Sequence, residues 1–451
     1  METANVHKPI FTNRELISLS VPIIIESVLA IITGMADSAM VSSAGEAATG
    51  GVSLVDQVMI LLVLLFSSIA SGGVVVTSQY LGNHDFVKAK SSAKQLLYAS
   101  TTIALLTVAC FIGIIPQILR LIFGDLEQAV FENAKVYFFY VLIGLPFYAI
   151  ATACTSLLRT MSHSKLALML AFGANLLNIA GNAILIHGFE MGAAGAAIAT
   201  TFSRIVWAAV GLVILHNRGL PVYFEQLLKF RIDFDVLRRV LKIGIANGIE
   251  NGLFQVGKLL VASLVSTFGT IYIAANAVTN TVCNIGWTIV GSISTILLTV
   301  VGRCIGANEP EQAKVYTKKF INIGHCMVFI VFGVTFLLRN QFVRLFDFGP
   351  EALEVAAQYT GIVSVLTITS FYGLTFAPLA AFRAAGDIKY AMVLTIASMF
   401  ICRVGLAYLL NSLFPLGLLS VWLGMFTDWA VHSICNTIHL RKGKWLTKRL
   451  I

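Results

Sequence analysis

Eight ionisable side chains interrupt long apolar stretches of this sequence, and they are the first candidates for chemistry. A charged residue at the centre of a lipid bilayer costs roughly 2.5–3.5 kcal/mol on insertion scales, so such residues are usually functional or paired. Asp37 is the strongest of them. Burial in an apolar medium favours the neutral acid over the carboxylate, which allows Asp37 to exchange a proton near physiological pH. Alternatively, its oxygens could bind Na⁺. The other seven are Glu26, Asp56, Arg204, Glu250, Lys258, Arg403 and Asp428.

The expected roles of these seven residues differ, and for Glu250 and Lys258 the spacing along the helix helps to define them. Lys258 follows Glu250 by two helical turns, about 80° around the axis, so the two indicate either a substrate-facing site or a buried ion network. Glu26 is expected to have a structural role. Buried pairing is expected for Arg204, Arg403 and Asp428, and solvation at the outer mouth of a helix for Asp56.

The elements that must position these side chains are transmembrane helices. Hydrophobic residues make up 57% of the 451 residues, charged residues only 12%, and the mean hydropathy is +0.86. A soluble domain carries about 25% charged residues. Spanning a bilayer takes about 20 apolar residues per helix. The first apolar run is too long for a signal peptide, so we expect no cleaved leader. We predict twelve spans, at 16–44, 58–80, 95–119, 136–158, 166–186, 191–215, 243–267, 274–302, 320–338, 356–382, 390–413 and 416–440.

Basic residues predict the orientation of these helices. With both termini on one side, the loops on that side hold 24 of the 31 Lys and Arg residues, and the opposite loops hold four. Positive charge stays in the cytoplasm, so we predict cytoplasmic termini in a prokaryotic plasma membrane. The net charge of +9 follows from this topology and gives no reason to expect a nucleic-acid partner. The seven cysteines show no metal or redox spacing, and we expect no cofactor.

An internal repeat divides the chain into two halves. Shifting the sequence by 224 residues aligns identical residues without a gap, among them Glu26 with Glu250, Gly45 with Gly269, Arg159 with Arg383, and Phe147-Tyr148 with Phe371-Tyr372. Each half holds six predicted spans, so the halves are parallel repeats. We predict an all-α membrane protein with an N-lobe at 1–215, a cytoplasmic linker at 216–239 and a C-lobe at 240–451, related by a pseudo-two-fold axis along the membrane normal. Such repeats are typical of transporters that bind substrate near the midplane.

Several motifs resemble the MATE (multidrug and toxic compound extrusion) family along essentially the whole chain. The first span combines Pro22 and Glu26 with Gly34-Met-Ala-Asp37. Matching loop signatures read Leu81-Gly82 and Ile305-Gly306, and the seventh span resembles the DinF-type branch at 250–258. The further motifs are Asn178-Ile-Ala-Gly-Asn182 and Gly192 to Thr200. The major facilitator superfamily also has six-plus-six helices, but its Asp-Arg loop signature is missing from 81–90.

This resemblance implies specific sites. In archaeal relatives an N-lobe cation site joins residues that correspond here to Asp37, Asn178, Asn182 and Thr200, with an Asp in place of Asn182. The resemblance also implies a helix hinge at Pro22. The Na⁺-coupled branch has a glutamate where this chain has Phe254 and an acid in the tenth span, which has none here, so a full C-lobe Na⁺ site is not expected. The Phe-Tyr pairs could line a cavity for flat cations or simply pack. The predicted substrate-cavity residues are Tyr148, Glu250, Phe254, Lys258 and Tyr372.

These expectations describe a monomeric secondary active antiporter rather than an enzyme. Ion influx would drive out small amphipathic organic compounds that are cationic or zwitterionic. H⁺ is favoured over Na⁺ because the N-lobe site has one titratable group. The alternative is a lipid-linked sugar flippase of the same superfamily, which would have a strongly cationic cavity. A membrane enzyme would need a nucleophile, metal cluster or acid pair, and none is recognisable in the sequence.

Overall fold

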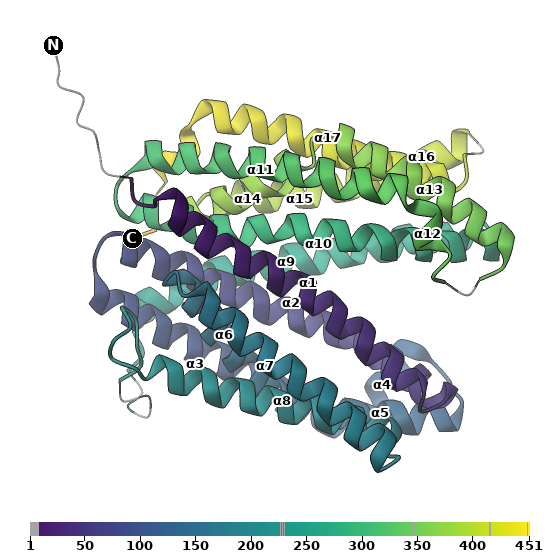
Figure 1. The fold of residues 1–451 in the computed structure, drawn as a ribbon. Helices are drawn as coiled ribbons and strands as arrows, with labels where there is room; N and C mark the ends of the chain where they lie inside the picture. The colour runs from purple at the N-terminus through teal and green to yellow at the C-terminus, as the bar shows by residue number, and fades with distance from the viewer. Residues whose placement is uncertain are drawn as a thin grey trace. The chain divides into compact units, whose positions relative to one another are not determined.

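The structure is a computed structural model, and the residues it describes are almost entirely helical (Figure 1). They are 9–225, 227, 229, 231–346, 348–414, 416–448 and 450–451. Part of the predicted cytoplasmic leader, residues 1–8, and three residues of the predicted linker, 226, 228 and 230, lie outside the described residues.

The described helices of the first half begin with three long segments, and later spans are interrupted by short 3₁₀ or π-helical turns or by a bend. They are α1 (Asn13–Ser42), α2 (Glu46–Gly82), α3 (Phe86–Phe111), the 3₁₀ turn η1 (Ile112–Ile114), α4 (Ile115–Phe123), α5 (Gln128–Ile143), α6 (Leu145–Thr160), α7 (Ser164–Asn182), the π-helical η2 (Ala183–Gly188) and α8 (Gly192–Leu215).

The second half repeats this order. Its helices are α9 (Phe234–Ser266), α10 (Thr270–Gly306), α11 (Pro310–Leu337), α12 (Arg339–Val343), α13 (Pro350–Thr369), α14 (Gly373–Ala385), α15 (Ile388–Ser398), the π-helical η3 (Met399–Gly405), α16 (Leu406–Leu413), α17 (Leu418–Lys442) and the 3₁₀ turn η4 (Lys444–Thr447).

Helices occupy all twelve predicted spans. Among the described residues, ten helices are long and apolar enough to cross a membrane, and the pair α5 and α6, bent by 46°, makes an eleventh. The remaining predicted span, the seventh at 243–267, falls on α9, which has 33 residues but carries Glu250 and Lys258 in its interior. Many large apolar side chains on these helices are exposed, for example Leu121 at 87% and Val213 at 72%. Exposed apolar faces of this extent are expected where lipid, rather than water, surrounds the protein.

The described chain divides into two compact units, residues 14–248 and residues 249–451 together with the N-terminal segment up to Asn13. Helix packing within the first unit is repeated within the second. In the first unit α2 packs against α3, α5 and α6, and α6 packs against α8. In the second, α10 packs against α11, α13 and α14, and α14 packs against α17. The sequence repeat is therefore also a repeat of tertiary structure.

Two glycines start equivalent helices in the two units. Gly45 precedes α2 with φ 102° and ψ 166°, and Gly269 precedes α10 with φ 95° and ψ 167°. This backbone region is accessible essentially only to glycine. The backbone conformation therefore explains why both repeats have glycine at this position.

Candidate functional site

Three helices join the four predicted cation-coupling residues in two hydrogen-bonded pairs. The side-chain amide of Asn182 on α7 donates a hydrogen bond to the Asp37 carboxylate on α1. One turn earlier on α7, Asn178 Nδ2 donates to Thr200 Oγ1 on α8 at 3.1 Å. Both asparagines are buried. The two amides therefore connect α1 and α8 through α7, and we call these four residues the N-lobe polar site.

Two charged residues that we did not assign to this site lie near it. Asp56 and Arg204 are close enough to Asp37 to interact with it electrostatically. Asp56, expected to be merely solvated, accepts a hydrogen bond from the Tyr137 hydroxyl at 3.1 Å. Arg204 follows Thr200 by one turn of α8, a spacing that places both on one face. That spacing was the signal in the sequence that could have associated Arg204 with the site.

The N-lobe polar site offers oxygen ligands as well as one acid. Asp37 supplies a carboxylate, Thr200 a hydroxyl, and the buried Oδ1 of Asn182 has no hydrogen-bond partner among the residues that the structure describes. Carboxylate, amide and hydroxyl oxygens suit a hard cation, whereas a single carboxylate suits a proton. Within the described residues, no group of three or more His, Cys, Asp and Glu residues is placed to hold a metal ion. The geometry is therefore compatible with H⁺ and leaves Na⁺ as the alternative.

Pro22, the predicted hinge, lies inside α1. Helix α1 continues through it from Asn13 to Ser42. A proline has no N–H, so the carbonyl of Ser18, one turn earlier, loses its helical partner. The hinge itself stays a prediction.

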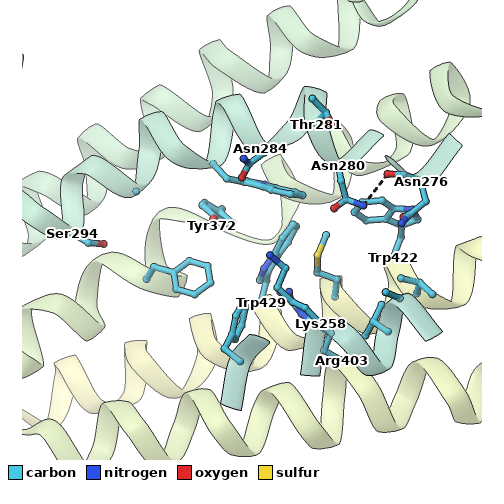
Figure 2. Close-up of a pocket in the computed structure, with 18 residues that line it drawn as sticks. Lys258, Asn276, Asn280, Thr281, Asn284, Ser294, Tyr372, Arg403, Trp422 and Trp429 are labelled. Carbon is cyan, nitrogen blue, oxygen red and sulfur yellow. Dashed lines mark hydrogen bonds between the residues drawn. The ribbon is translucent and has the colours of Figure 1, made fainter. Parts of the chain in front are cut away.

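A cavity of about 750 Å³ lies within the second unit, and we call it the C-lobe cavity. Three of the predicted cavity residues line it, namely Phe254, Lys258 and Tyr372. Figure 2 shows Lys258 and Arg403 on one side of it, and Asn276, Asn280 and Asn284 of α10 on the other. The asparagines recur at every fourth residue and so share one helix face. That periodicity is visible in the sequence and is a signal for a polar helix face.

Glu250 has a different environment from the one that we predicted for a cavity residue. Its carboxylate forms an ion pair with Arg383 of α14, and it does not appear among the residues around the C-lobe cavity. The repeat-related residues do the same in the first unit, where Glu26 pairs with Arg159 of α6. Each pair joins the first helix of a repeat to the fourth span. Of the two interpretations of Glu250, the structure therefore favours the ion network.

Tyr148 belongs to the first unit and is not among the described residues that line the C-lobe cavity. Its ring packs edge to face on Trp207, with centroids 6.2 Å apart. The Arg204 guanidinium lies 5.2 Å from the Tyr148 ring centroid and donates a hydrogen bond to the Val141 carbonyl at 3.3 Å. Arg204 thus has a ring and a carbonyl as neighbours, and it forms no ion pair with the acids of the described chain.

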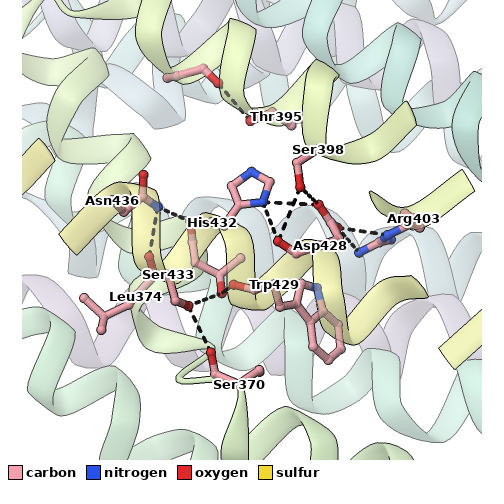
Figure 3. A network of polar contacts seen from close by, with 12 residues as sticks. Ser370, Leu374, Thr395, Ser398, Arg403, Asp428, Trp429, His432, Ser433 and Asn436 are labelled. Carbon is pink, nitrogen blue, oxygen red and sulfur yellow. Dashed lines mark hydrogen bonds and ion pairs between the residues drawn. The ribbon is translucent and has the colours of Figure 1, made fainter. Parts of the chain in front are cut away.

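Arg403 and Asp428 are paired, as expected, in a buried network (Figure 3). A terminal guanidinium nitrogen of Arg403 lies 2.8 Å from Asp428 Oδ2, and Nε donates to the same oxygen at 3.0 Å. Ser398 donates to Asp428 Oδ1 at 2.5 Å, and His432 Nδ1 lies 3.2 Å from that oxygen. Asp428 and His432 are both 1% exposed. We missed His432, although its position four residues after Asp428 places it on the same helix face.

Both repeats place a π-helical segment beside these polar groups. The segment η2 begins directly after Asn182, and η3 contains Arg403. A π-bulge shifts the helix register and is frequent at functional sites. The N-lobe polar site and the C-lobe network are therefore built on similar interruptions of two helices.

Comparison with protein-family models shows which family has this architecture. The MatE family model matches the chain twice, at residues 22–184 and 247–409. The chain belongs to the MatE family. The two matches cover the two repeats, and MatE proteins are transporters rather than enzymes, so this chain is a multi-pass membrane transporter.

Sequence relatives of this MatE chain cover nearly its whole length. The uncharacterized transporter YisQ of Bacillus subtilis (strain 168) is 26% identical, with 98% of this chain and 97% of the relative covered. The probable multidrug resistance protein NorM of Thermotoga maritima is 25% identical, with 96% and 93% covered.

Solved structures share the fold. A structure described as the outward-facing conformation of a multidrug resistance MATE family transporter of the MOP superfamily superposes with a TM-score of 0.90 at 20% identity, covering 96% of both chains. A MOP superfamily transporter from Pyrococcus furiosus, whose description reports a reverse polarity of the binding pocket, superposes at 0.89 and 20% identity, again with 96% of both chains covered. The predicted all-α membrane fold of two six-helix lobes is confirmed. The DinF-type branch stays a prediction.

Proposed function

We propose that this MatE chain is a secondary active antiporter that exports amphipathic organic compounds in exchange for protons. The observation that carries the proposal is the hydrogen bond from Asn182 to Asp37. It places the one carboxylate of the N-lobe polar site against a buried amide that links α1 to α7. A change in the protonation of Asp37 changes what it can accept from Asn182, and so changes the contact between these two helices.

Proton coupling is preferred to Na⁺ coupling because of the residue types in the site. The position of the second carboxylate in archaeal relatives is taken by the amide of Asn182. An amide cannot titrate and has no charge to offset that of a cation, so a Na⁺ ion would have one anionic ligand only. The coupling ion would be H⁺ bound at Asp37.

The export function is supported by relatives that are named probable multidrug resistance proteins, such as that of Thermotoga maritima. The two repeats supply the lobes that alternate access to a site near the midplane. The basic loops predict cytoplasmic termini in a plasma membrane, with protons entering as substrate leaves.

Transport by the purified full-length protein in proteoliposomes tests this proposal. A fluorescent amphipathic compound is loaded, and a proton gradient is imposed without Na⁺, followed in a separate experiment by a Na⁺ gradient at equal pH. We expect transport with the proton gradient alone and its loss in Asp37→Asn. The matched control is Glu132→Gln, because Glu132 is a carboxylate with a half-exposed side chain that pairs with Lys135 outside the site.

Three results would contradict parts of the proposal. Transport by the Na⁺ gradient alone would overturn the choice of ion. Unchanged proton-driven transport in Asp37→Asn would remove Asp37 from the mechanism. Translocation of a lipid-linked sugar, with no movement of amphipathic compounds under either gradient, would favour the flippase.

A further inference from the structure

The C-lobe cavity has an unusual balance of charge for a site that would receive organic cations. Among the described residues, its lining includes two basic ones, Lys258 and Arg403, and no aspartate or glutamate. The remaining polar lining is neutral, consisting of amides, hydroxyls and indoles. A cationic substrate would therefore find no carboxylate in this cavity, whereas an anionic group would find two cations.

The two cations differ in how far they are neutralised. Arg403 is paired with Asp428, so its charge is largely compensated within the wall of the cavity. Lys258 forms no ion pair or hydrogen bond with any residue that the structure describes. The nearest acid on its own helix, Glu250, is already paired with Arg383. Lys258 is thus the cavity's uncompensated charge.

Lys258 and Arg403 also lie close enough to repel each other. Figure 2 shows both side chains on the same side of the cavity. An anionic group beside Lys258 would offset this repulsion, whereas a cation would add a third positive charge. Interactions between charges are stronger in a partly desolvated cavity than in water, so this preference is substantial.

Hydrogen-bond donors without acceptors point the same way. The indole nitrogens of Trp287 and Trp422 are buried in the wall without a partner among the described residues. An indole N–H and an ammonium group are donors only. Unpaired donors of this kind favour a ligand rich in acceptors.

The rings of the cavity define the rest of the ligand. Trp429 packs edge to face on Trp287, with centroids 5.7 Å apart, and on Tyr372, with centroids 5.1 Å apart. These surfaces suit a flat aromatic body. On the α10 side, the buried Oδ1 of Asn276 has no partner in the described part of the chain and can accept from an N–H group of the same ligand.

We propose that the C-lobe cavity binds an aromatic compound that bears a carboxylate, as an anion or a zwitterion, and that the carboxylate pairs with Lys258. This inference deepens the proposed export function and rests on it for its physiological meaning. It departs from the sequence-based expectation of a cationic substrate and is compatible with a zwitterionic one.

Binding to the purified full-length protein in detergent, with no ion gradient, tests this inference separately from transport. Three fluorescent probes share one aromatic body and carry a carboxylate, a neutral amide or an ammonium group. Quenching of tryptophan fluorescence reports binding near Trp287, Trp422 and Trp429. We expect the carboxylate probe to bind tightest to the wild type.

The matched variants are Lys258→Met and Lys258→Arg. We expect Lys258→Met to lower the affinity for the carboxylate probe about ten- to a hundred-fold, which corresponds to the loss of a hydrogen bond to a charged group. Lys258→Met should change the affinity for the amide probe by no more than about two-fold. Lys258→Arg should retain most of the affinity for the carboxylate probe. These controls separate loss of the charge from loss of folding, because a misfolded variant would lose all three probes.

Tightest binding of the ammonium probe to the wild type, or equal carboxylate binding by wild type and Lys258→Met, would overturn the inference. Displacement of the probes by a short-chain anionic phospholipid but not by the free aromatic carboxylate would also overturn it, in favour of a lipid headgroup. Carboxylate binding without gradient-driven transport would leave the site in place and refute the antiporter, so the two failures are distinguishable.

Discussion

Lys258 and Arg403 line one cavity, but of the two only Arg403 is paired with an acid in the described chain, through Asp428 at 2.8 Å. This difference assigns them different roles. Lys258 is available to a ligand, whereas Arg403 is held by the network of Ser398, Asp428 and His432 and shapes the wall. Variants of the two residues should therefore separate binding from stability.

Asp428→Asn should lower the stability of the protein. Removal of one partner of a buried ion pair leaves an uncompensated charge and costs about 3–5 kcal/mol. Asp428 is 1% exposed, so little solvent is available to compensate. The free energy of unfolding in detergent, or the midpoint of thermal unfolding, measures the effect.

The double variant Arg403→Met with Asp428→Leu is its control. Replacement of both charges by apolar residues leaves neither charge uncompensated and is often nearly neutral, while Ser398 and His432 lose the Asp428 carboxylate as a partner in both variants of this comparison that remove its charge. We expect the double variant to be more stable than Asp428→Asn alone. The opposite order would mean that the network contributes more than the pairing of its charges.

The ion pairs of the repeat should differ in their contribution to stability. The Glu250 side chain is 7% exposed and that of Glu26 is 16% exposed. Arg383→Met should therefore lower the free energy of unfolding by about 3 kcal/mol, near the low end for a buried pair, and Arg159→Met by less. Thermal unfolding of the two variants side by side measures this difference.

Exchange of the two charges between Glu250 and Arg383 tests whether their ion pair is the cause of the loss of stability. Glu250→Arg combined with Arg383→Glu should recover part of the stability that either substitution alone removes. A coupling energy below about 0.5 kcal/mol in this cycle would show that the two side chains do not act together.

Asn182→Asp should make transport respond to Na⁺. The substitution places a second carboxylate beside Asp37, and a pair of anionic oxygen ligands binds a hard cation better than one. We expect Na⁺-stimulated transport, or thermal stabilisation by Na⁺, in the variant but not in the wild type. Asn178→Asp is not a matched control because Asn178 contacts Thr200, so Asn182→Leu serves instead. A variant indifferent to Na⁺ would mean that the other oxygens are not placed as ligands.

Gly45→Ala and Gly269→Ala should each cost about 1–3 kcal/mol, the range for a residue held in a sparsely populated backbone region. Apart from the residue itself and its two chain neighbours, no described heavy atom lies within 4 Å of the Cβ that either substitution adds, so backbone strain is the expected cause. Gly252→Ala is the control, because its Cβ also meets nothing within 4 Å and its backbone is helical. This control should be neutral or stabilising. Equal stability of all three variants would refute the conformational explanation.

The sequence by itself determines the number of membrane spans, their predicted orientation and the internal repeat. The cost of exposing backbone and charge to lipid limits each apolar run to a helix, so the twelve spans and their basic loops follow from short stretches of sequence. The repeat could also be recognised in the sequence, because the same local backbone geometry requires identical residues such as Gly45 and Gly269. The hydrogen-bonded set of Asp37 and Asn182 was reached only through family resemblance.

Tertiary structure decided which charges meet. Glu250 and Arg383 are 133 residues apart, and no spacing rule relates side chains on different helices. Whether Glu250 faced a substrate or an arginine therefore depended on how α9 packs beside α14. The same holds for Lys258, which forms no ion pair among the described residues, whereas Arg403 beside the same cavity is paired with Asp428. The sequence supplied the ionisable groups, and helix packing decided which of them were neutralised by an ion pair and which were not, because electrostatic interactions depend on distances that only the folded chain defines.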